Sequence, residues 1–319
     1  WYTRKMARRR RRNVVNSRIE WLLGLALAQL VLIGLVVFSG ALTEDDNTGF
    51  SVLEENQIEA FVVSDQDSAI RIERGDAQWS VEGYLGDADK ISGVVEKVLA
   101  LEAAWPVASS VSSAERFEVA ENKYQRKLSF FDGEGETLET FYLGTSPSYQ
   151  RVHARQMGSD DIYSVKLSNY EFGLKTDDWL DKSLTKITGN ITEVHLIASE
   201  GQSSVEKSLV ERDDVWEIGG QLADQAAAKN YVARFSNLRV LGIADKTGKK
   251  ISDVKVLADG EEVVYGLFAV FDNDGEVEDY ILRSSAVEGS FRLAAYVAEQ
   301  ILLTDTDLLP SDSEEGSES

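Results

Sequence analysis

The sequence contains no cysteine among its 319 residues. Disulfide bonds, thiolate metal sites and anchoring through a lipidated cysteine are therefore excluded. The two histidines, His153 and His195, have no partner at a spacing typical of metal ligands. Three prolines and 24 glycines in 319 residues argue against a long disordered stalk. These absences are compatible with a bacterial periplasm, where disulfides are allowed but not required.

Sequence motifs of common enzyme classes are also missing. Gly219-Gly220 follows a strand-like segment but lacks the third glycine of a nucleotide-binding loop. There is no Gly-x-Ser-x-Gly nucleophile elbow. Acidic pairs such as Asp160 and Asp161 do not have the ligand spacing of a calcium loop. We therefore expect no catalytic residue, no cofactor and no metal ion, and hence a non-enzymatic protein.

The charge is strongly acidic and unevenly distributed. The chain has 33 basic and 55 acidic residues, but residues 1–20 hold eight of the basic side chains and one acid, Glu20. The remainder has 25 basic and 54 acidic residues. Binding to nucleic acid needs lysine and arginine to replace phosphate counterions, so we expect no nucleic-acid partner. A basic partner or a saline environment would suit this charge.

An uncharged apolar run covers residues 21–42, with Gln29 its one strongly polar side chain. About 20 apolar residues span a hydrocarbon core of about 30 Å, so this run predicts a single-pass transmembrane helix. A cleaved signal peptide is the alternative. Residues 1–20 form a basic segment, and the positive-inside rule places it in the cytoplasm and the bulk of the chain in the periplasm of a bacterial inner membrane. The anchor and topology residues are Arg8, Arg9, Arg10, Arg11, Arg12, Arg18 and the interfacial Trp21.

The apolar run and its basic flank also suggest binding partners. The arginines could bind anionic lipid or nucleic acid instead of only setting topology. Small residues permit close approach of helices, and a glutamine can hydrogen-bond across an interface. The membrane lipid bilayer and integral-membrane proteins are thus the expected partners, although the same residues could simply face lipid. The predicted helix–helix contact residues are Gly24, Ala28, Gln29 and Gly34.

The rest of the chain contains an internal duplication. Aligning Trp79 with Trp216 without gaps also aligns Asp87 with Asp224. Each aspartate is a candidate N-cap before a run of apolar residues at helical spacing, which predicts helices over residues 87–101 and 224–238. We expect a linker at 43–56, a first lobe at 57–187, a second lobe at 188–308 and a disordered acidic tail at 309–319.

Strand-like segments flank each predicted helix, so each half is predicted as β-β-β-α-β-β-β. Closing helices are expected over residues 167–174 and 290–303. The predicted fold class is α+β: one N-terminal transmembrane helix followed by two similar α+β lobes with mainly antiparallel sheets.

One polar cluster remains as a candidate binding site. Arg151 and Arg155 are separated by two pleats of a predicted strand and so share a face. With Tyr149 they could form a patch for an anion or a glycan. Cross-strand salt bridges on this acidic surface are the alternative.

A short basic start, the apolar run, Trp79 with the following helix, and Trp179-Leu180-Asp181-Lys182-Ser183-Leu184 together resemble a bacterial family catalogued as domain of unknown function 4340. Members of that family resemble accessory proteins encoded beside gliding-motility-type ABC transporters. The resemblance implies an ABC permease and its auxiliary subunit as partners, and it supplies no catalytic residues.

Three functions follow from these observations. The first is a membrane-anchored periplasmic accessory or scaffold subunit of an envelope ABC transport complex. The alternative is a periplasmic ligand-binding module for lipid, glycan or peptidoglycan, with its site in a cleft between the lobes. A hydrolase would need a clustered acid–base or metal site, which no spacing in the sequence provides.

Overall fold

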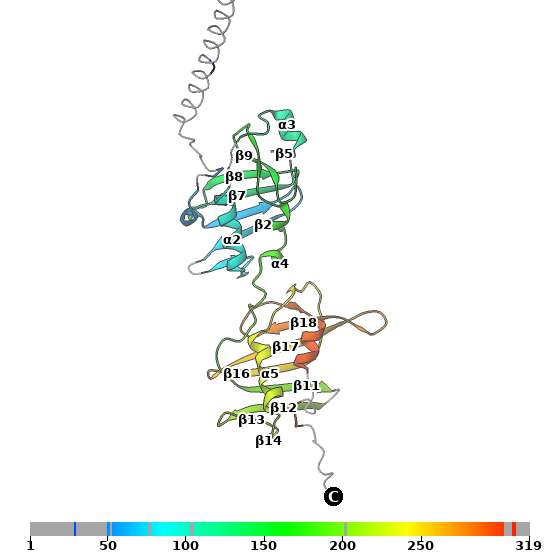
Figure 1. The fold of residues 1–319 in the computed structure, drawn as a ribbon. Helices are drawn as coiled ribbons and strands as arrows, with labels where there is room; N and C mark the ends of the chain where they lie inside the picture. Colours follow the sequence, from blue (N-terminus) through cyan, green and yellow to red (C-terminus); the bar gives the residue numbers. More distant parts are fainter. Residues whose placement is uncertain are drawn as a thin grey trace, which may run out of the picture.

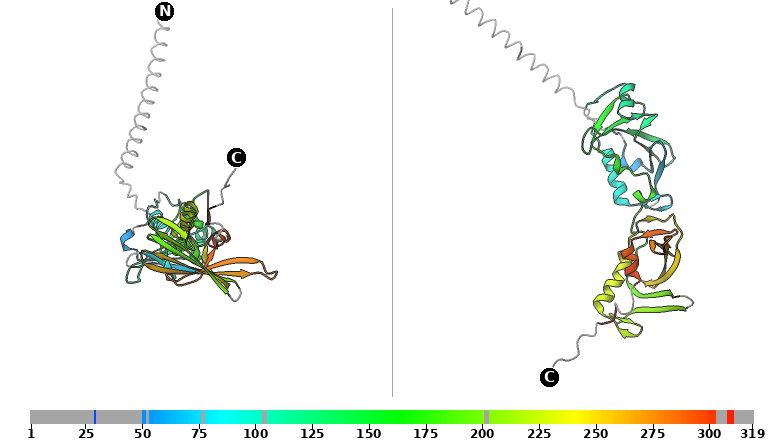
Figure 2. Two further views of the ribbon diagram at one scale, coloured as in Figure 1. Left: turned by 90° about the horizontal axis from the view of Figure 1, so that it is seen from below. Right: turned by 90° about the vertical axis from the view of Figure 1, so that its right-hand side faces the viewer.

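The computed structural model describes Gln29 and residues 50–51, 53–75, 78–102, 105–200, 203–302 and 308–310. These residues form two lobes that follow one another along an elongated molecule (Figures 1 and 2). Each lobe is built on one antiparallel sheet. The chain passes from the first sheet to the second once, through residues 166–190.

The first lobe contains an eight-stranded sheet in the order β10-β9-β8-β7-β1-β2-β3-β4. Helix α2 (Ala88–Leu99) packs on one face and buries Ile91, Val94, Val95 and Val98. The strands are β1 (Ala60–Ser64), β2 (Ala69–Arg74), β3 (Trp79–Val81), β4 (Tyr84–Leu85), β7 (Arg126–Phe131), β8 (Thr137–Leu143), β9 (Val152–Gln156) and β10 (Ile162–Val165). A short 3-10 helix, η1 (Glu55–Gln57), precedes them.

The second lobe contains a nine-stranded sheet in the order β14-β13-β12-β11-β16-β17-β18-β19-β15. Helices α5 (Gln225–Ser236) and α6 (Ala295–Ile301) pack against its core. The strands are β11 (Ile191–Glu200), β12 (Ser203–Arg212), β13 (Val215–Ile218), β14 (Gln221–Leu222), β15 (Gly242–Ile243), β16 (Lys249–Ala258), β17 (Glu261–Phe271), β18 (Val277–Ser284) and β19 (Phe291–Leu293).

The two sheets repeat one strand order. Starting from β4 in one sheet and from β14 in the other, eight successive strands correspond, and β15 is added beyond β19. In both lobes a tight hairpin leads into the main helix, and an aspartate caps that helix. Asp87 accepts a hydrogen bond from the Lys90 N–H, and Asp224 accepts from the Ala226 and Ala227 N–H groups. Both helices predicted from the sequence are confirmed, because an aspartate at the N-cap satisfies N–H groups that have no partner within the helix.

Aromatic side chains dominate the core of the first lobe. The Phe61 ring contacts the rings of Trp79, Phe130 and Trp179 at centroid distances of 5.9, 5.9 and 5.4 Å. Phe50 is also buried in this core, against Phe141. The described part of the predicted linker thus packs on the first lobe.

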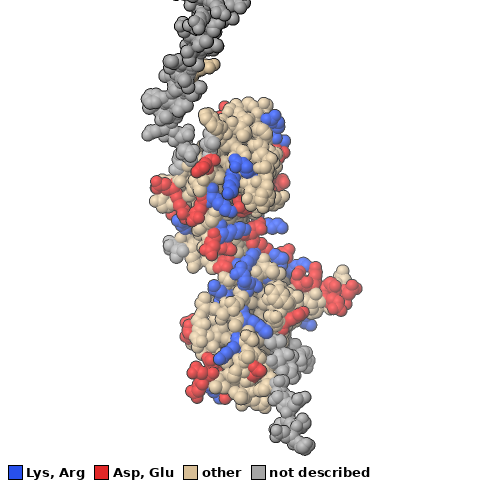
Figure 3. All heavy atoms as spheres, in the orientation of Figure 1, with Lys and Arg blue, Asp and Glu red and all other residues tan. Residues whose placement is uncertain are grey.

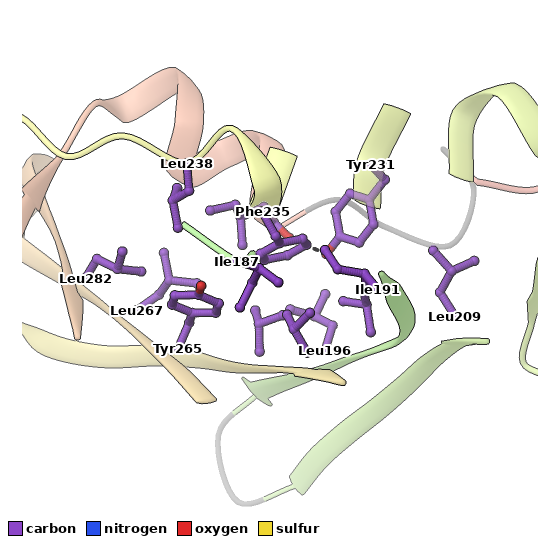
Figure 4. Close-up of a cluster of buried hydrophobic side chains, with 14 of the residues drawn as sticks. Ile187, Ile191, Leu196, Leu209, Tyr231, Phe235, Leu238, Tyr265, Leu267 and Leu282 are labelled. Carbon is purple, nitrogen blue, oxygen red and sulfur yellow. Dashed lines mark hydrogen bonds between the residues drawn. The ribbon is translucent and has the colours of Figure 1, made fainter. Parts of the chain in front are cut away.

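The core of the second lobe lies between its sheet and α5 (Figure 4). Phe235 contacts Tyr231 on the same helix and Tyr265 on β17, with ring centroids 5.6 and 5.8 Å apart. The two buried phenols donate hydrogen bonds to backbone carbonyls, Tyr231 to Ile301 at 2.8 Å and Tyr265 to Thr185 at 2.6 Å. Burial raises the pKa of both phenols well above the usual range, so both remain neutral donors.

The first lobe has an insert that packs on part of the second face of its sheet, over β8, β9 and β10. The insert contains α3 (Val111–Arg116), β5 (Val119–Ala120) and β6 (Lys123–Tyr124). It buries Tyr142 and Ile162, and Tyr142 alternates with core residues on β8 and so points to the opposite face. In the second lobe, the described residues between α5 and β16 hold β15 alone.

The predicted α+β fold class is wrong, because both lobes are β-rich and the structure is mostly antiparallel sheet. Each lobe has one helix of 12 residues against a sheet of eight or nine strands. Several strands, such as β3, β4 and β19, are only two or three residues long. Such short strands carry too few residues to show an alternating pattern, so the sequence underestimates the sheet.

The predicted closing helices are also corrected. Residues 167–174 contain a 3-10 turn, η2 (Asn169–Glu171), and the short helix α4 (Thr176–Trp179) follows. Ser168 caps η2 through its hydroxyl, which favours a separate turn over a continuous helix. In the second lobe the segment begins as β19, because Phe291 and Leu293 both point into the core, and the helix α6 starts at Ala295.

The single-pass transmembrane helix requires a correction too. No helix within the described residues is long and apolar enough to cross a membrane. The predicted span at 21–42 and its basic flank, with Arg8 to Arg12, Arg18, Trp21, Gly24, Ala28 and Gly34, lie outside the described residues; Gln29 is described, as an exposed helical residue. A long apolar run makes a segment a candidate for a membrane span and does not by itself establish one.

Candidate functional site: the cleft between the lobes

Two neighbouring residues join the lobes, because each is buried in a different core. Trp179 is fully buried in the core of the first lobe, and Leu180 is buried in the core of the second. The backbone supports this arrangement, since the Asp87 N–H donates to the Trp179 carbonyl at 2.8 Å and the Asp181 N–H donates to the Leu85 carbonyl at 2.9 Å. Trp179 and Leu180 are consecutive in the chain, so the two cores are joined with no free residue between them.

Asp177 provides a polar link beside this apolar one. Its carboxylate lies 2.6 Å from the Arg292 guanidinium and accepts the Ile243 N–H at 2.7 Å. A Cβ atom at Gly242 would lie 2.1 Å from Asp177 Oδ2, so this approach requires a glycine. A first-lobe carboxylate is therefore held by β15 and β19 of the second lobe.

Lys182 completes the polar junction. Its ammonium group donates to the Asp177 carbonyl at 2.6 Å, and its own carbonyl accepts the Val240 N–H at 2.8 Å. Burial lowers the pKa of the Lys182 ammonium below its ordinary value, an effect that the nearby Asp177 partly offsets. Figure 3 shows acidic and basic side chains interspersed where the lobes meet.

A cleft of about 440 Å³ opens beside this junction and is lined by both lobes. The first lobe contributes the β3–β4 hairpin, and the second contributes the loop between β18 and β19. This volume lies within the usual range for small-ligand pockets. The lining residues are Gln78, Glu82, Gly83, Tyr84, Leu85, Leu184, Val287 and Glu288.

The wall of the cleft is well defined. Glu82 and Gly83, at the hairpin turn, both have positive φ, and Glu82 accepts a hydrogen bond from the Thr176 hydroxyl at 2.5 Å. The Tyr84 ring packs edge-on against Phe291 of the second lobe with centroids 5.8 Å apart. A Cβ at Gly289 would come within 3.1 Å of the Tyr84 ring, so this glycine also permits the contact. One carboxylate and one aromatic ring are therefore held at fixed positions beside the cleft.

The structure does not gather the predicted anion or glycan patch at one exposed surface. Tyr149 is 89% exposed, whereas Arg155 is 7% exposed. The Arg155 guanidinium donates to the carbonyls of Val119 and Ser159 at 2.7 and 2.9 Å and stacks over Tyr142. Arg151 is exposed and donates to the Ser164 hydroxyl at 2.9 Å. Arg155 therefore holds the insert on the sheet, and binding at Tyr149 and Arg151 stays a prediction.

Both histidine side chains are engaged by neighbouring residues of the fold. His153 stacks on Phe117 with ring centroids 4.1 Å apart, and its Nδ1 lies 2.9 Å from the Thr145 carbonyl oxygen. His195 Nε2 lies 3.0 Å from Glu193 Oε2, and its Nδ1 lies 2.8 Å from the Ser208 hydroxyl oxygen. Within the part of the chain that the structure describes, no three histidine, aspartate or glutamate side chains are grouped to hold a metal ion.

The cleft residues were not identified from the sequence. The glycine at Gly83 is typical of a tight turn and can be read from the sequence. The loop at Val287 and Glu288 is remote in sequence and reaches this hairpin only in the folded chain. The Trp179–Leu184 stretch carries part of the family resemblance, and the structure places it at the junction. The available signal in the sequence was the adjacent pair of large apolar side chains, Trp179 and Leu180.

Comparison with known proteins gives a family but no function. Residues 79–256, more than half of the chain, match the family model described as "Domain of unknown function (DUF4340)". The match starts at the β3 hairpin and ends in β16, so it includes the junction. No curated protein and no solved structure matches the chain.

Proposed function

The chain belongs to this family, and on that premise we propose that it is a non-enzymatic accessory or scaffold subunit of an envelope ABC transport complex of the gliding-motility type. Its partners in this proposal are the ABC permease and its auxiliary subunit, and its two lobes lie in the periplasm. The resemblance of family members to proteins encoded beside such transporters motivates the choice of complex.

The junction is the observation that carries the scaffold proposal. Trp179, Leu180 and Asp177 tie the two lobes into one elongated body, which suits a protein that holds partners at a fixed separation. An enzyme would need clustered acid–base or nucleophilic groups with matched pKa values. Among the described residues, the basic side chains with lowered pKa values are His153 and Lys182, and both are engaged in packing and backbone hydrogen bonds.

Affinity purification of the tagged chain from cells solubilised in mild detergent tests the proposal. Mass spectrometry should find an ABC permease and an ATPase at near-stoichiometric amounts. The same tag on an unrelated acidic periplasmic protein is the control, since it reports binding by charge alone. Recovery of neither transporter subunit, or equal recovery with the control, would remove the proposal.

The cleft favours a second candidate function, a periplasmic ligand-binding module for lipid, glycan or peptidoglycan. Its volume of about 440 Å³ is sufficient for a small ligand. Native mass spectrometry of the purified chain distinguishes the two functions. A lipid or glycan that remains bound without transporter subunits would favour the binding module.

A further inference from the structure

The charges and shape of the cleft between the lobes indicate the chemistry of its occupant. Among the described residues that line it, the charged ones are Glu82 on the first lobe and Glu288 on the second. An anionic ligand would be repelled by this pair. A cationic group would be attracted to both lobes at once.

The uncharged part of the lining fits a cation with an apolar stem. Tyr84, Leu85, Leu184 and Val287 provide aromatic and aliphatic surface in the same cleft. Lysine and arginine place methylene groups along apolar surface while the charged end reaches a polar group. An aromatic ring adds cation–π attraction to the same side chain.

The cleft is also organised before any ligand arrives. The Thr176 hydroxyl orients the Glu82 carboxylate, and the packing of Tyr84 against Phe291 fixes the aromatic wall. Binding then requires little further ordering of these side chains, which favours affinity. The chain as a whole carries a formal charge of −22, which adds long-range attraction for a basic partner.

We propose that this cleft receives a lysine- or arginine-bearing segment of a protein partner. The inference rests on the proposed function in one respect, namely that the chain has a protein partner. It specifies the chemistry of the contact and places it at Glu82, Tyr84 and Glu288.

Fluorescence anisotropy with the full-length chain tests the contact directly. The probe is a fluorescein-labelled peptide with two arginines in a glycine–serine background, and the matched probe replaces both arginines with neutral citrulline. We expect binding of the arginine peptide and at least about tenfold weaker binding by the double variant Glu82→Gln/Glu288→Gln. The citrulline peptide should bind equally weakly to both proteins.

A charge-matched variant separates the cleft from the general acidity of the chain. Glu134→Gln/Glu261→Gln removes the same two charges from exposed positions that do not line the cleft. This control should bind the arginine peptide within about twofold of the wild type. An equal loss in both double variants, or no discrimination between the two peptides, would overturn the inference.

Two further arms identify the occupant and separate this inference from the proposed function. Spermine that binds more tightly than the peptide and loses this affinity in Glu82→Gln/Glu288→Gln would assign the cleft to a polyamine and overturn the protein-segment proposal. Transporter subunits that co-purify equally with wild type and with this variant would leave the accessory function intact and overturn the cleft contact. Specific peptide binding without co-purifying subunits would support the cleft contact and remove the transporter.

Discussion

At the residue scale, His153 makes stability depend on pH. Burial and the nearby Arg116 lower the pKa of its imidazole, although the hydrogen bond to the Thr145 carbonyl acts in the opposite direction. The unfolded chain, whose histidine has an ordinary pKa of about 6.5, therefore binds this proton at a higher pH than the folded chain does. Stability is lost as the pH falls below this value, by at most about 1.4 kcal/mol per pH unit for one proton.

The variant His153→Asn tests this effect, because asparagine retains a polar group near Nδ1 but does not titrate. We expect the variant to be less stable at pH 7 by about 1 kcal/mol, through the lost stacking on Phe117, and to lose less stability than the wild type between pH 7 and pH 5. Urea unfolding at several pH values measures both. Parallel pH curves for the two proteins would show that His153 titrates alike in both states.

At the element scale, two glycines of the first lobe have equal room for a side chain but differ in backbone conformation. A Cβ at Gly93 in α2, or at Gly135 in the β7–β8 turn, would meet nothing within 4 Å, but Gly135 has a φ of 83°. Gly93→Ala should stabilise the protein by about 0.5–1 kcal/mol, because alanine loses less conformational entropy in a helix.

Gly135→Ala is the matched variant and should destabilise the protein by about 1 kcal/mol, because a side chain is disfavoured at positive φ. Thermal unfolding of both variants gives the comparison. Shifts of the same sign would mean that added apolar surface, and not backbone geometry, determines the effect.

At the scale of the whole molecule, Gly242 and Asp177 couple the two lobes. Gly242→Ala places a methyl group where the Asp177 carboxylate lies, so the links to Arg292 and Ile243 must break. We expect a loss of about 1–3 kcal/mol, and calorimetry should separate one unfolding transition into two.

The stability of a double variant tests whether the clash with Asp177 causes this loss. In Gly242→Ala/Asp177→Ala the carboxylate is gone, so the double variant should be no less stable than Asp177→Ala alone. Additive losses would show that Gly242 is required for β15 itself and not for the contact between lobes.

Several parts of the fold were determined by local sequence. Asp87 and Asp224 each precede apolar residues at helical spacing, and each caps a helix of the structure. Capping and periodicity involve neighbours within a few residues, so the sequence alone reveals them. The absence of cysteine likewise excluded thiolate chemistry at once.

The sequence by itself thus determined the two main helices, the acidic charge and the family resemblance. Tertiary structure decided that the lobes are β-rich, that Arg155 is buried, that Trp179 and Leu180 join two cores, and that Glu82 and Glu288 face one cleft. The physical reason is the distance along the sequence between the residues that stabilise each feature. Short strands and the walls of a cleft gain their stability from residues far away in the chain, and no local pattern records those partners.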